Sequence, residues 1–310
     1  MMELPLVFLA GIAAVSFGCS LLSATALGLG WKRLGRLAPA AQSRVLLAAA
    51  LAPALASFSL LAAMGFDLAV HLGAAQQCLV YAFGPPSSLS AGLAILWTLR
   101  LGRQGWVALR AVHHTRSIRR TLECVSSASG AVTRILPVDE PQAFVVGMRR
   151  PRMYLSRGLL ESAGSGDLES VMAHESYHIE HRDPLRRLIA SIGLAFHLPG
   201  IAFAIERRLA ATMESAADAD AARALGDAPR VAEALVRLAR LRLVQVPLGV
   251  GMLGSDLEFR VRELLSPATR PDRPAAALLV AAAAIGFAGA LLAAEPVHTV
   301  FESIVRLLAG

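Results

Sequence analysis

The sequence predicts a mainly α-helical integral membrane protein with about four transmembrane helices and a cytoplasmic α+β domain between the third and the fourth. Composition is the first reason, because 55% of the 310 residues are hydrophobic and only 17% are charged, which is more apolar than a typical soluble domain. The second reason is distribution. The apolar residues gather in long runs near the N-terminus and again near residues 275–294, and a more polar middle region separates them.

Four apolar runs have about the length needed to cross ~30 Å of hydrocarbon. They cover residues 4–29, 45–64, 79–101 and 274–294. The first run follows Glu3 and lacks a basic leader, so we interpret it as a retained transmembrane helix and not as a cleaved signal peptide. Gly84, Pro85 and Pro86 interrupt the start of the third.

Basic residues predict the orientation of these spans. The loop between the first two contains Lys32, Arg33, Arg36 and Arg44 and no acid, and a series of arginines from Arg100 to Arg120 follows the third. Both regions should therefore be cytoplasmic and both termini extracytoplasmic, in a multi-pass protein of the inner (cytoplasmic) membrane. Because this topology explains the net charge of +7, we expect the lipid bilayer as a partner and no direct nucleic-acid binding.

The chain divides accordingly into four parts. Residues 1–101 form an N-terminal membrane region, 102–273 the cytoplasmic domain, 274–294 the fourth transmembrane helix and 295–310 a short extracytoplasmic tail. Within the domain, strand-like stretches at 132–138, 143–146 and 152–155, with Gly147 and Pro151 between the last two, predict a small β-hairpin.

A helical pattern replaces the strand pattern from Gly166 onward. Asp167 is the candidate cap of this helix, and Leu168, Val171 and Met172 have the spacing of one buried face. Further helices are predicted at residues 201–225, 229–244 and 256–265.

The helix that starts near Gly166 carries the sequence HESYH. His174 and His178 are four residues apart, so both imidazoles project from one face of a helix and can bind one Zn²⁺ ion. Glu175 lies between them, where it can act as the general base on a zinc-bound water. The motif predicts that the domain is a zincin-like metallopeptidase; the alternative is an ordinary solvated helix.

A catalytic zinc ion needs a third protein ligand. The spacing His-x-x-Gly-x-x-His, which would supply a third histidine, is absent after the motif. Downstream, Glu214 is the candidate ligand, and Asp218, one turn later on the same helix, is the candidate acceptor for a histidine N–H. The alternative for Glu214 is an ordinary carboxylate on a helix surface.

The stretch between the second histidine and Glu214, residues 188–205, is almost wholly apolar. A membrane crossing here would separate His178 from Glu214, and arginines flank the stretch on both sides. We therefore expect a helical hairpin or re-entrant element, broken at Pro199 and Gly200, in or against the bilayer. His197 is a candidate hydrogen-bond donor to the transition state; the alternative is a histidine packed at the helix bend.

The predicted hairpin also has a candidate role in substrate binding. The stretch formed by Ala143, Phe144, Val145 and Val146 could pair with an extended peptide and hold its backbone over the zinc ion. The alternative is a purely structural hairpin.

Six segments together resemble the membrane antirepressor metallopeptidases of BlaR/MecR type, metallopeptidase family 56 within the gluzincins. They are residues 143–147 (AFVVG), 150–152 (RPR), 156–160 (SRGLL), 174–178 (HESYH), 182–184 (RDP) and 214–218 (ESAAD). The resemblance covers roughly residues 1–295. It implies a signal-transducing protease that inactivates a cytoplasmic repressor, for example a winged-helix repressor. Only residues 295–310 follow the last span, so we do not expect this chain alone to sense β-lactams.

Two other functions remain open from the sequence. One is an HtpX-type quality-control protease that degrades misfolded membrane proteins. The other is a signalling scaffold that binds zinc without proteolysis.

Overall fold

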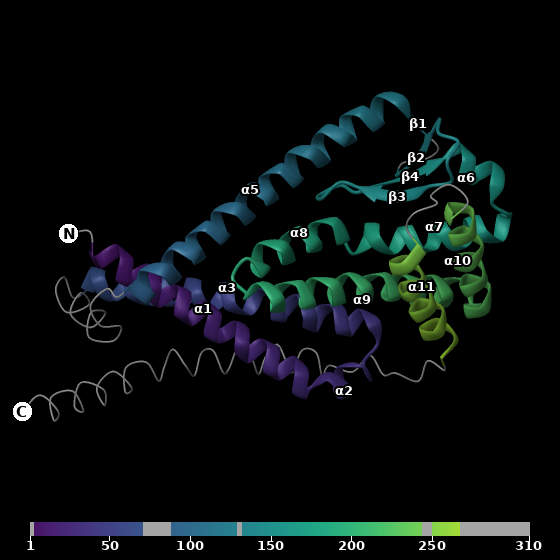
Figure 1. The fold of residues 1–310 in the computed structure, drawn as a ribbon. Coiled ribbons are helices and arrows are strands. Elements are labelled where there is room, and N and C mark those ends of the chain that lie inside the picture. The colour runs from purple at the N-terminus through teal and green to yellow at the C-terminus, as the bar shows by residue number, and fades with distance from the viewer. Residues whose placement is uncertain (1–2, 71–87, 129–131, 244–249, 267–310) are drawn as a thin grey trace, which may run out of the picture.

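A computed structural model of the protein describes residues 3–70, 88–128, 132–243 and 250–266. These residues are mostly helical, with one small sheet (Figure 1). The helices are α1 (Glu3–Leu29), α2 (Trp31–Leu34), α3 (Pro39–Val70), α5 (Ser88–Val125), α6 (Arg157–Ser162), α7 (Ser165–Glu180), α8 (Asp183–Leu194), α9 (Pro199–Leu225), α10 (Ala228–Leu243) and α11 (Val250–Leu265). The strands are β1 (Ser127–Ala128), β2 (Thr133–Leu136), β3 (Ala143–Val146) and β4 (Arg152–Ser156). The predicted mixture of many helices with a small sheet is confirmed.

Three long helices, α1, α3 and α5, meet at one end of the molecule (Figure 1). The first two predicted spans fall inside α1 and α3, and the described part of the third lies in α5, which continues without a break to Val125. Of the described residues, one helical stretch, Pro39–Phe58, is long and apolar enough to cross a membrane, and Val15–Leu29 is a shorter apolar one. The fourth predicted span and the tail after it lie outside the described residues.

The apolar stretch before Glu214 forms a helical hairpin, as predicted. Helix α8 ends at Leu194 and α9 begins at Pro199, whose fixed φ suits the first turn of a helix. The closed end of this hairpin packs among α1, α3 and α5, where Phe196 meets Trp97 edge to face at 5.8 Å between ring centroids. Gly193 lets α8 approach α3 closely, since a Cβ there would lie 2.5 Å from the Ala50 carbonyl oxygen.

The sheet has the strand order β1-β2-β4-β3. Strands β3 and β4 form the predicted antiparallel hairpin, and Gly147, with φ of 118°, makes the turn in a conformation that favours glycine. The sheet is larger than predicted, because β2 pairs with β4 in parallel and β1 extends the far edge. Strand β3 remains at the opposite edge.

One face of the sheet packs against α7, where Met153 and Leu155 of β4 and Val171 of α7 form a buried cluster with Leu168 at its margin. Two predictions for this helix are wrong. Met172 is 39% exposed, whereas Val171 beside it is buried against the sheet. Asp167 is not the cap, since Gly164 takes that position and Asp167 instead pairs with Arg237 of α10 at 2.6 Å.

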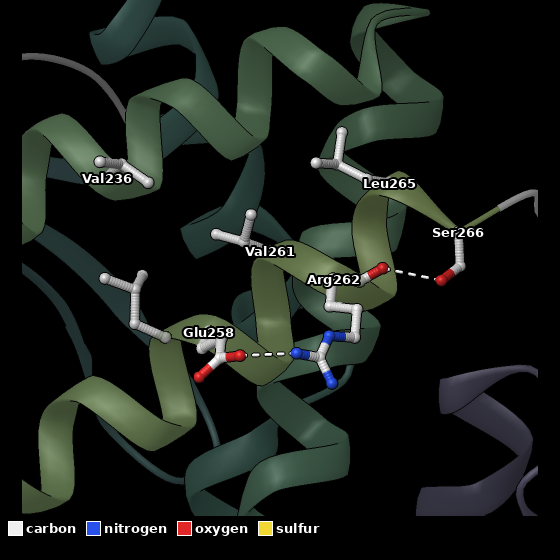
Figure 2. A pocket seen from close by; sticks show the side chains of 7 residues that line it. Val236, Glu258, Val261, Arg262, Leu265 and Ser266 are labelled. Carbon is white, nitrogen blue, oxygen red and sulfur yellow. Dashed lines mark hydrogen bonds and ion pairs between the residues drawn. The ribbon is translucent and has the colours of Figure 1, made fainter.

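A cavity of about 630 Å³ lies between α10 and α11 (Figure 2). It is lined by Val236, Leu257, Glu258, Val261, Arg262, Leu265 and Ser266. The two charged residues on its rim pair with each other, since Arg262 donates to Glu258 at 2.6 Å. The cavity contains neither histidine of the HESYH motif, so it is not the site that the sequence predicts.

Candidate metal centre

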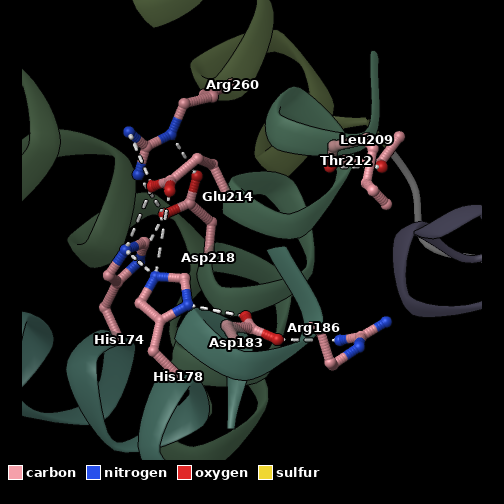
Figure 3. A network of polar contacts seen from close by, with 9 residues as sticks. All are labelled: His174, His178, Asp183, Arg186, Leu209, Thr212, Glu214, Asp218 and Arg260. Atoms are coloured by element: carbon pink, nitrogen blue, oxygen red, sulfur yellow. Dashed lines mark hydrogen bonds and ion pairs between the residues drawn. The ribbon is translucent and has the colours of Figure 1, made fainter. Parts of the chain in front are cut away.

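Helices α7 and α9 pack side by side and bring three candidate ligands together (Figure 3). His174 and His178 project from one face of α7, because four residues make about one helical turn. Their Nε2 atoms lie 3.2 Å apart. Glu214 of α9 faces them, with carboxylate oxygens 3.5 Å from Nε2 of His174 and 4.0 Å from Nε2 of His178.

These distances fit a zinc ion. Zinc bound to nitrogen and oxygen at about 2.0–2.1 Å in a tetrahedron requires ligand atoms about 3.3 Å apart. The two histidines and Glu214 offer three ligand atoms that all lie within 4.8 Å of one another. Three protein ligands leave one tetrahedral position for water, which is the arrangement of catalytic zinc sites.

Carboxylates lie behind both histidines. Asp218 Oδ1 is 2.9 Å from Nδ1 of His174, and Asp183 Oδ2 is 2.7 Å from Nδ1 of His178. The hydrogen bond to Asp183 keeps the proton of His178 on Nδ1, and the negative charge of Asp218 favours the same position in His174. Both Nε2 lone pairs then point at the same position, where a cation or a proton relieves their repulsion. The donor set therefore suits a divalent metal ion.

The sequence predicts Asp218 in this role but misses Asp183. Asp183 begins α8, and Arg182 before it has a left-handed φ of 51°, which turns the chain back so that Asp183 faces His178. The acid-proline pair at 183–184, placed just after the motif, is the local signal that could have indicated it, since proline favours the first turn of a new helix. Asp183 Oδ1 also accepts a hydrogen bond from Arg186 at 2.8 Å.

Arg260 of α11 is a second residue that the sequence does not reveal. Its guanidinium group makes two hydrogen bonds to Asp218, of 2.6 Å and 2.7 Å, and lies 3.7 Å from Glu214 (Figure 3). Asp218 is only 1% exposed, so Arg260 balances a charge that water does not reach. The helix at 256–265 was predicted, but nothing in its spacing indicates contact with α9.

The charges shift the pKa values of the ligands strongly. Burial alone would lower the pKa of His174, but hydrogen bonds with Asp218 and Glu214 outweigh it and raise the pKa to about 9. Burial would raise the pKa of Glu214, but the contact with His174 and nearby positive charges lower it to about 2. Negative charge is thus concentrated around the two Nε2 atoms, which favours binding of a cation.

One further predicted residue, Glu175, and the predicted substrate strand lie beside this centre. Glu175 follows His174 on α7, and its charge contributes to the raised pKa of Arg260, which places it near that guanidinium group. Strand β3 packs against α7 and forms an edge of the sheet. Glu175 therefore lies on the helix that carries the histidines, and the strand packs against that helix.

The prediction that His197 donates a hydrogen bond to the transition state is wrong. Its side chain is fully buried in the α8–α9 turn, with Nδ1 3.1 Å from Ser20 Oγ and Nε2 3.1 Å from the Ala49 carbonyl oxygen. Glu214 is sixteen residues after Leu198, or about 24 Å along α9 at 1.5 Å per residue. His197 instead packs at the helix bend, the alternative role that the sequence left open.

A histidine pair on one helix, a glutamate on a second helix and a small sheet beside the first fit the class of zinc metallopeptidases. Residues 119–242 match Peptidase family M48. The matched part contains all four strands of the sheet, the three candidate ligands, Asp183 and Asp218, and it ends before Arg260. The match supports the metallopeptidase class, whereas the BlaR/MecR type that the motifs resemble remains a prediction.

Proposed function

We propose that this protein is a membrane-embedded zinc endopeptidase that hydrolyses peptide bonds at the cytoplasmic face. His174, His178 and Glu214 would hold the metal ion, and Asp218 and Asp183 would orient the two histidines. The observation that carries the proposal is the convergence of three ligand atoms on one point, with a carboxylate behind each imidazole.

The chemistry of the chain's own residues follows from their positions. A bound zinc ion supplies a Lewis acid that lowers the pKa of a coordinated water to about 7 and polarises the scissile carbonyl. Glu175 accepts the proton of the attacking water and then donates it to the leaving amine. Arg260 holds Asp218 and Glu214 in place and offsets the negative charge around the centre.

Strand β3 is the proposed support for the substrate backbone. The backbone N–H of Ser156 donates to the carbonyl oxygen of Gln142 at 2.9 Å. Because every second residue of an antiparallel strand bonds to the same neighbour, Phe144 also bonds to β4. Ala143 and Val145 therefore direct their backbone N–H and C=O groups to the other side, which is the edge of the sheet. A peptide substrate can pair with these groups as an added strand.

A proline scan tests this pairing. We expect Val145→Pro to raise KM by removing one N–H from the free edge, while the ladder to β4 and the melting temperature are retained. The matched variant Phe144→Pro breaks the ladder and should lower the melting temperature. Unchanged KM in a folded Val145→Pro protein would rule out pairing at that residue.

The proposed membrane location is supported by exposed apolar side chains on the helices that meet at one end of the molecule. They include Leu21, Leu22, Leu55, Phe58, Ile95, Leu96, Leu99, Ile189, Ile192 and Phe203. Soluble monomers rarely expose so much large apolar surface. We propose that α1, α3, α5 and the closed end of the α8–α9 hairpin lie in the bilayer. Release of the protein from membranes by alkaline carbonate, or a C-terminal reporter that reads cytoplasmic, would contradict this topology.

Two substrate classes are proposed for the same site. The resemblance to the BlaR/MecR type favours a cytosolic transcriptional repressor, such as a winged-helix protein. The proximity of the centre to the apolar helices, together with a match to a different peptidase family, favours degradation of misfolded membrane proteins by an HtpX-type enzyme.

Quantitative proteomics of cells that carry the wild-type protein or Glu175→Gln separates these classes. Accumulation of one DNA-binding protein in the variant supports the first, and accumulation of many membrane proteins supports the second. A zinc-binding scaffold predicts instead that Glu175→Gln leaves protein levels and signalling unchanged.

A further inference from the structure

A second cavity, of about 370 Å³, lies between α3, α7 and α8 on the far side of Asp183 from the metal centre. It is lined by Ala40, Arg44, Leu47, Ala48, Leu51, Tyr177, His181 and Arg186. The volume lies at the lower end of small-molecule sites, so the cavity has room for a headgroup and the adjoining part of a lipid.

The polar lining of this cavity is cationic. Arg44 of α3 and Arg186 of α8 contribute guanidinium groups, and the ring of His181 stacks on Tyr177 with centroids 3.9 Å apart. The residues that line the cavity include no carboxylate. Two guanidinium groups beside one opening favour a phosphate, whose oxygens accept several hydrogen bonds at once.

The apolar lining comes from one face of α3. Ala40, Arg44, Leu47, Ala48 and Leu51 follow each other at helical spacing, so the lining runs about 16 Å along the axis. Charge lies near the start of this face and Leu51 at its far end, inside the helical stretch that is long and apolar enough to cross a membrane. Along this helix a cationic side chain comes first and an apolar surface follows. A phospholipid in a bilayer has the same order, with the headgroup first and the acyl chain deeper.

We propose that this cavity binds an anionic phospholipid, with the phosphate between Arg44 and Arg186 and the first part of an acyl chain along Leu47 and Leu51. The proposal rests on the membrane location proposed above, but not on zinc binding or proteolysis.

The bound lipid would be coupled to the metal centre through two hydrogen bonds. Arg186 donates to Asp183 at 2.8 Å and also to Ser43 of α3 at 3.1 Å, and Asp183 contacts His178 at 2.7 Å. A phosphate on Arg186 shares the guanidinium charge with Asp183 and so changes the contact that orients the ring of His178. Arg186 is thus a positioning residue between the lipid site and His178.

Native mass spectrometry of the detergent-purified full chain tests the proposal. Wild-type protein is titrated with phosphatidylglycerol or phosphatidylcholine, and also with inorganic phosphate alone. Arg44→Gln removes one of the two cations, and Ala48→Trp fills the cavity without changing its charge. Arg187→Gln is the matched control, because Arg187 is the chain neighbour of Arg186 and does not line the cavity.

We expect one phosphatidylglycerol per chain, with at least about tenfold weaker retention in Arg44→Gln and in Ala48→Trp and no change in Arg187→Gln. Melting temperatures confirm that each variant is folded. Phosphatidylcholine that binds as well as phosphatidylglycerol would overturn the proposal, and so would a loss of lipid in Arg187→Gln as large as that in Arg44→Gln. Inorganic phosphate that binds without displacing phosphatidylglycerol would also contradict a shared phosphate site. Zinc content measured on the same samples separates this outcome from failure of the proposed peptidase, since lipid binding needs no metal.

Discussion

Asp183→Asn is the change that tests the support of the metal ligands most sharply, because it removes one charge and keeps the shape of the side chain. The carboxylate is 4% exposed and lies 2.7 Å from Nδ1 of His178, so water cannot take its place. Loss of such a partner typically weakens metal binding by about 10- to 100-fold, which is about 1.4–2.7 kcal/mol.

The orientation of the new amide group decides where in this range the result falls. If the amide oxygen of the substituted side chain faces Nδ1, the histidine tautomer is kept and the loss is near tenfold. If its NH₂ group faces Nδ1, the proton moves to Nε2, which can no longer bind zinc, and the loss approaches 100-fold.

The assay is zinc competition against a chromophoric chelator with detergent-purified protein. The matched control is Asp220→Asn. Asp220 pairs with an arginine three residues later, Arg223, in the same way as Asp183 pairs with Arg186. Among the described residues, however, Asp220 belongs to no group that could hold a metal ion. A zinc affinity of folded Asp183→Asn within twofold of wild type, or an equal loss in Asp220→Asn, would refute the role assigned to Asp183.

Three further predictions concern Arg260, His174 and Gly193. Arg260→Met leaves Asp218 buried without its main counter-charge and should lower the free energy of unfolding by about 3 kcal/mol. Adding Asp218→Asn should restore part of this loss. Chemical unfolding measures both variants, with Arg262→Met as the exposed control, and wild-type stability of Arg260→Met would contradict the prediction. Because the pKa of His174 is raised to about 9 in the metal-free protein, zinc must displace a proton from this residue at neutral pH. The zinc affinity should therefore increase up to about tenfold per pH unit toward pH 9 and then level off. A zinc affinity that falls between neutral pH and pH 9 would contradict this prediction. Gly193→Ala places a Cβ 2.5 Å from the Ala50 carbonyl oxygen and should destabilise the protein by about 1–3 kcal/mol, measured as a lower melting temperature. The control is Gly200→Ala, since a Cβ at Gly200 meets no atom within 4 Å. Equal melting temperatures of the two variants would contradict the close approach of α8 and α3.

Local patterns were sufficient to predict which residues of the candidate metal centre lie together. The spacing of His174 and His178 follows from helix geometry alone, and the helix period also places Asp218 one turn after Glu214. The β3–β4 hairpin was predictable for a similar reason, because Gly147 separates two short apolar strands.

Contacts between distant elements were not predictable from such patterns. Arg260 reaches Asp218 from another helix, 42 residues later in the chain. Asp183 faces His178 only because Arg182 adopts a left-handed conformation. Met172 has the period of a buried residue but is exposed, and the extent of the surface that packs on a helix is not encoded in the helix itself.

The measurement that tests the central claim most directly is zinc content together with peptide cleavage for the wild-type, Glu175→Gln and Glu214→Ala proteins. We expect about one zinc ion per chain and cleavage in the wild type, zinc without cleavage in Glu175→Gln, and loss of both in Glu214→Ala. A folded wild-type protein with neither zinc nor proteolysis, or Glu175→Gln protein that cleaves at the wild-type rate, would contradict a zinc peptidase that uses these residues.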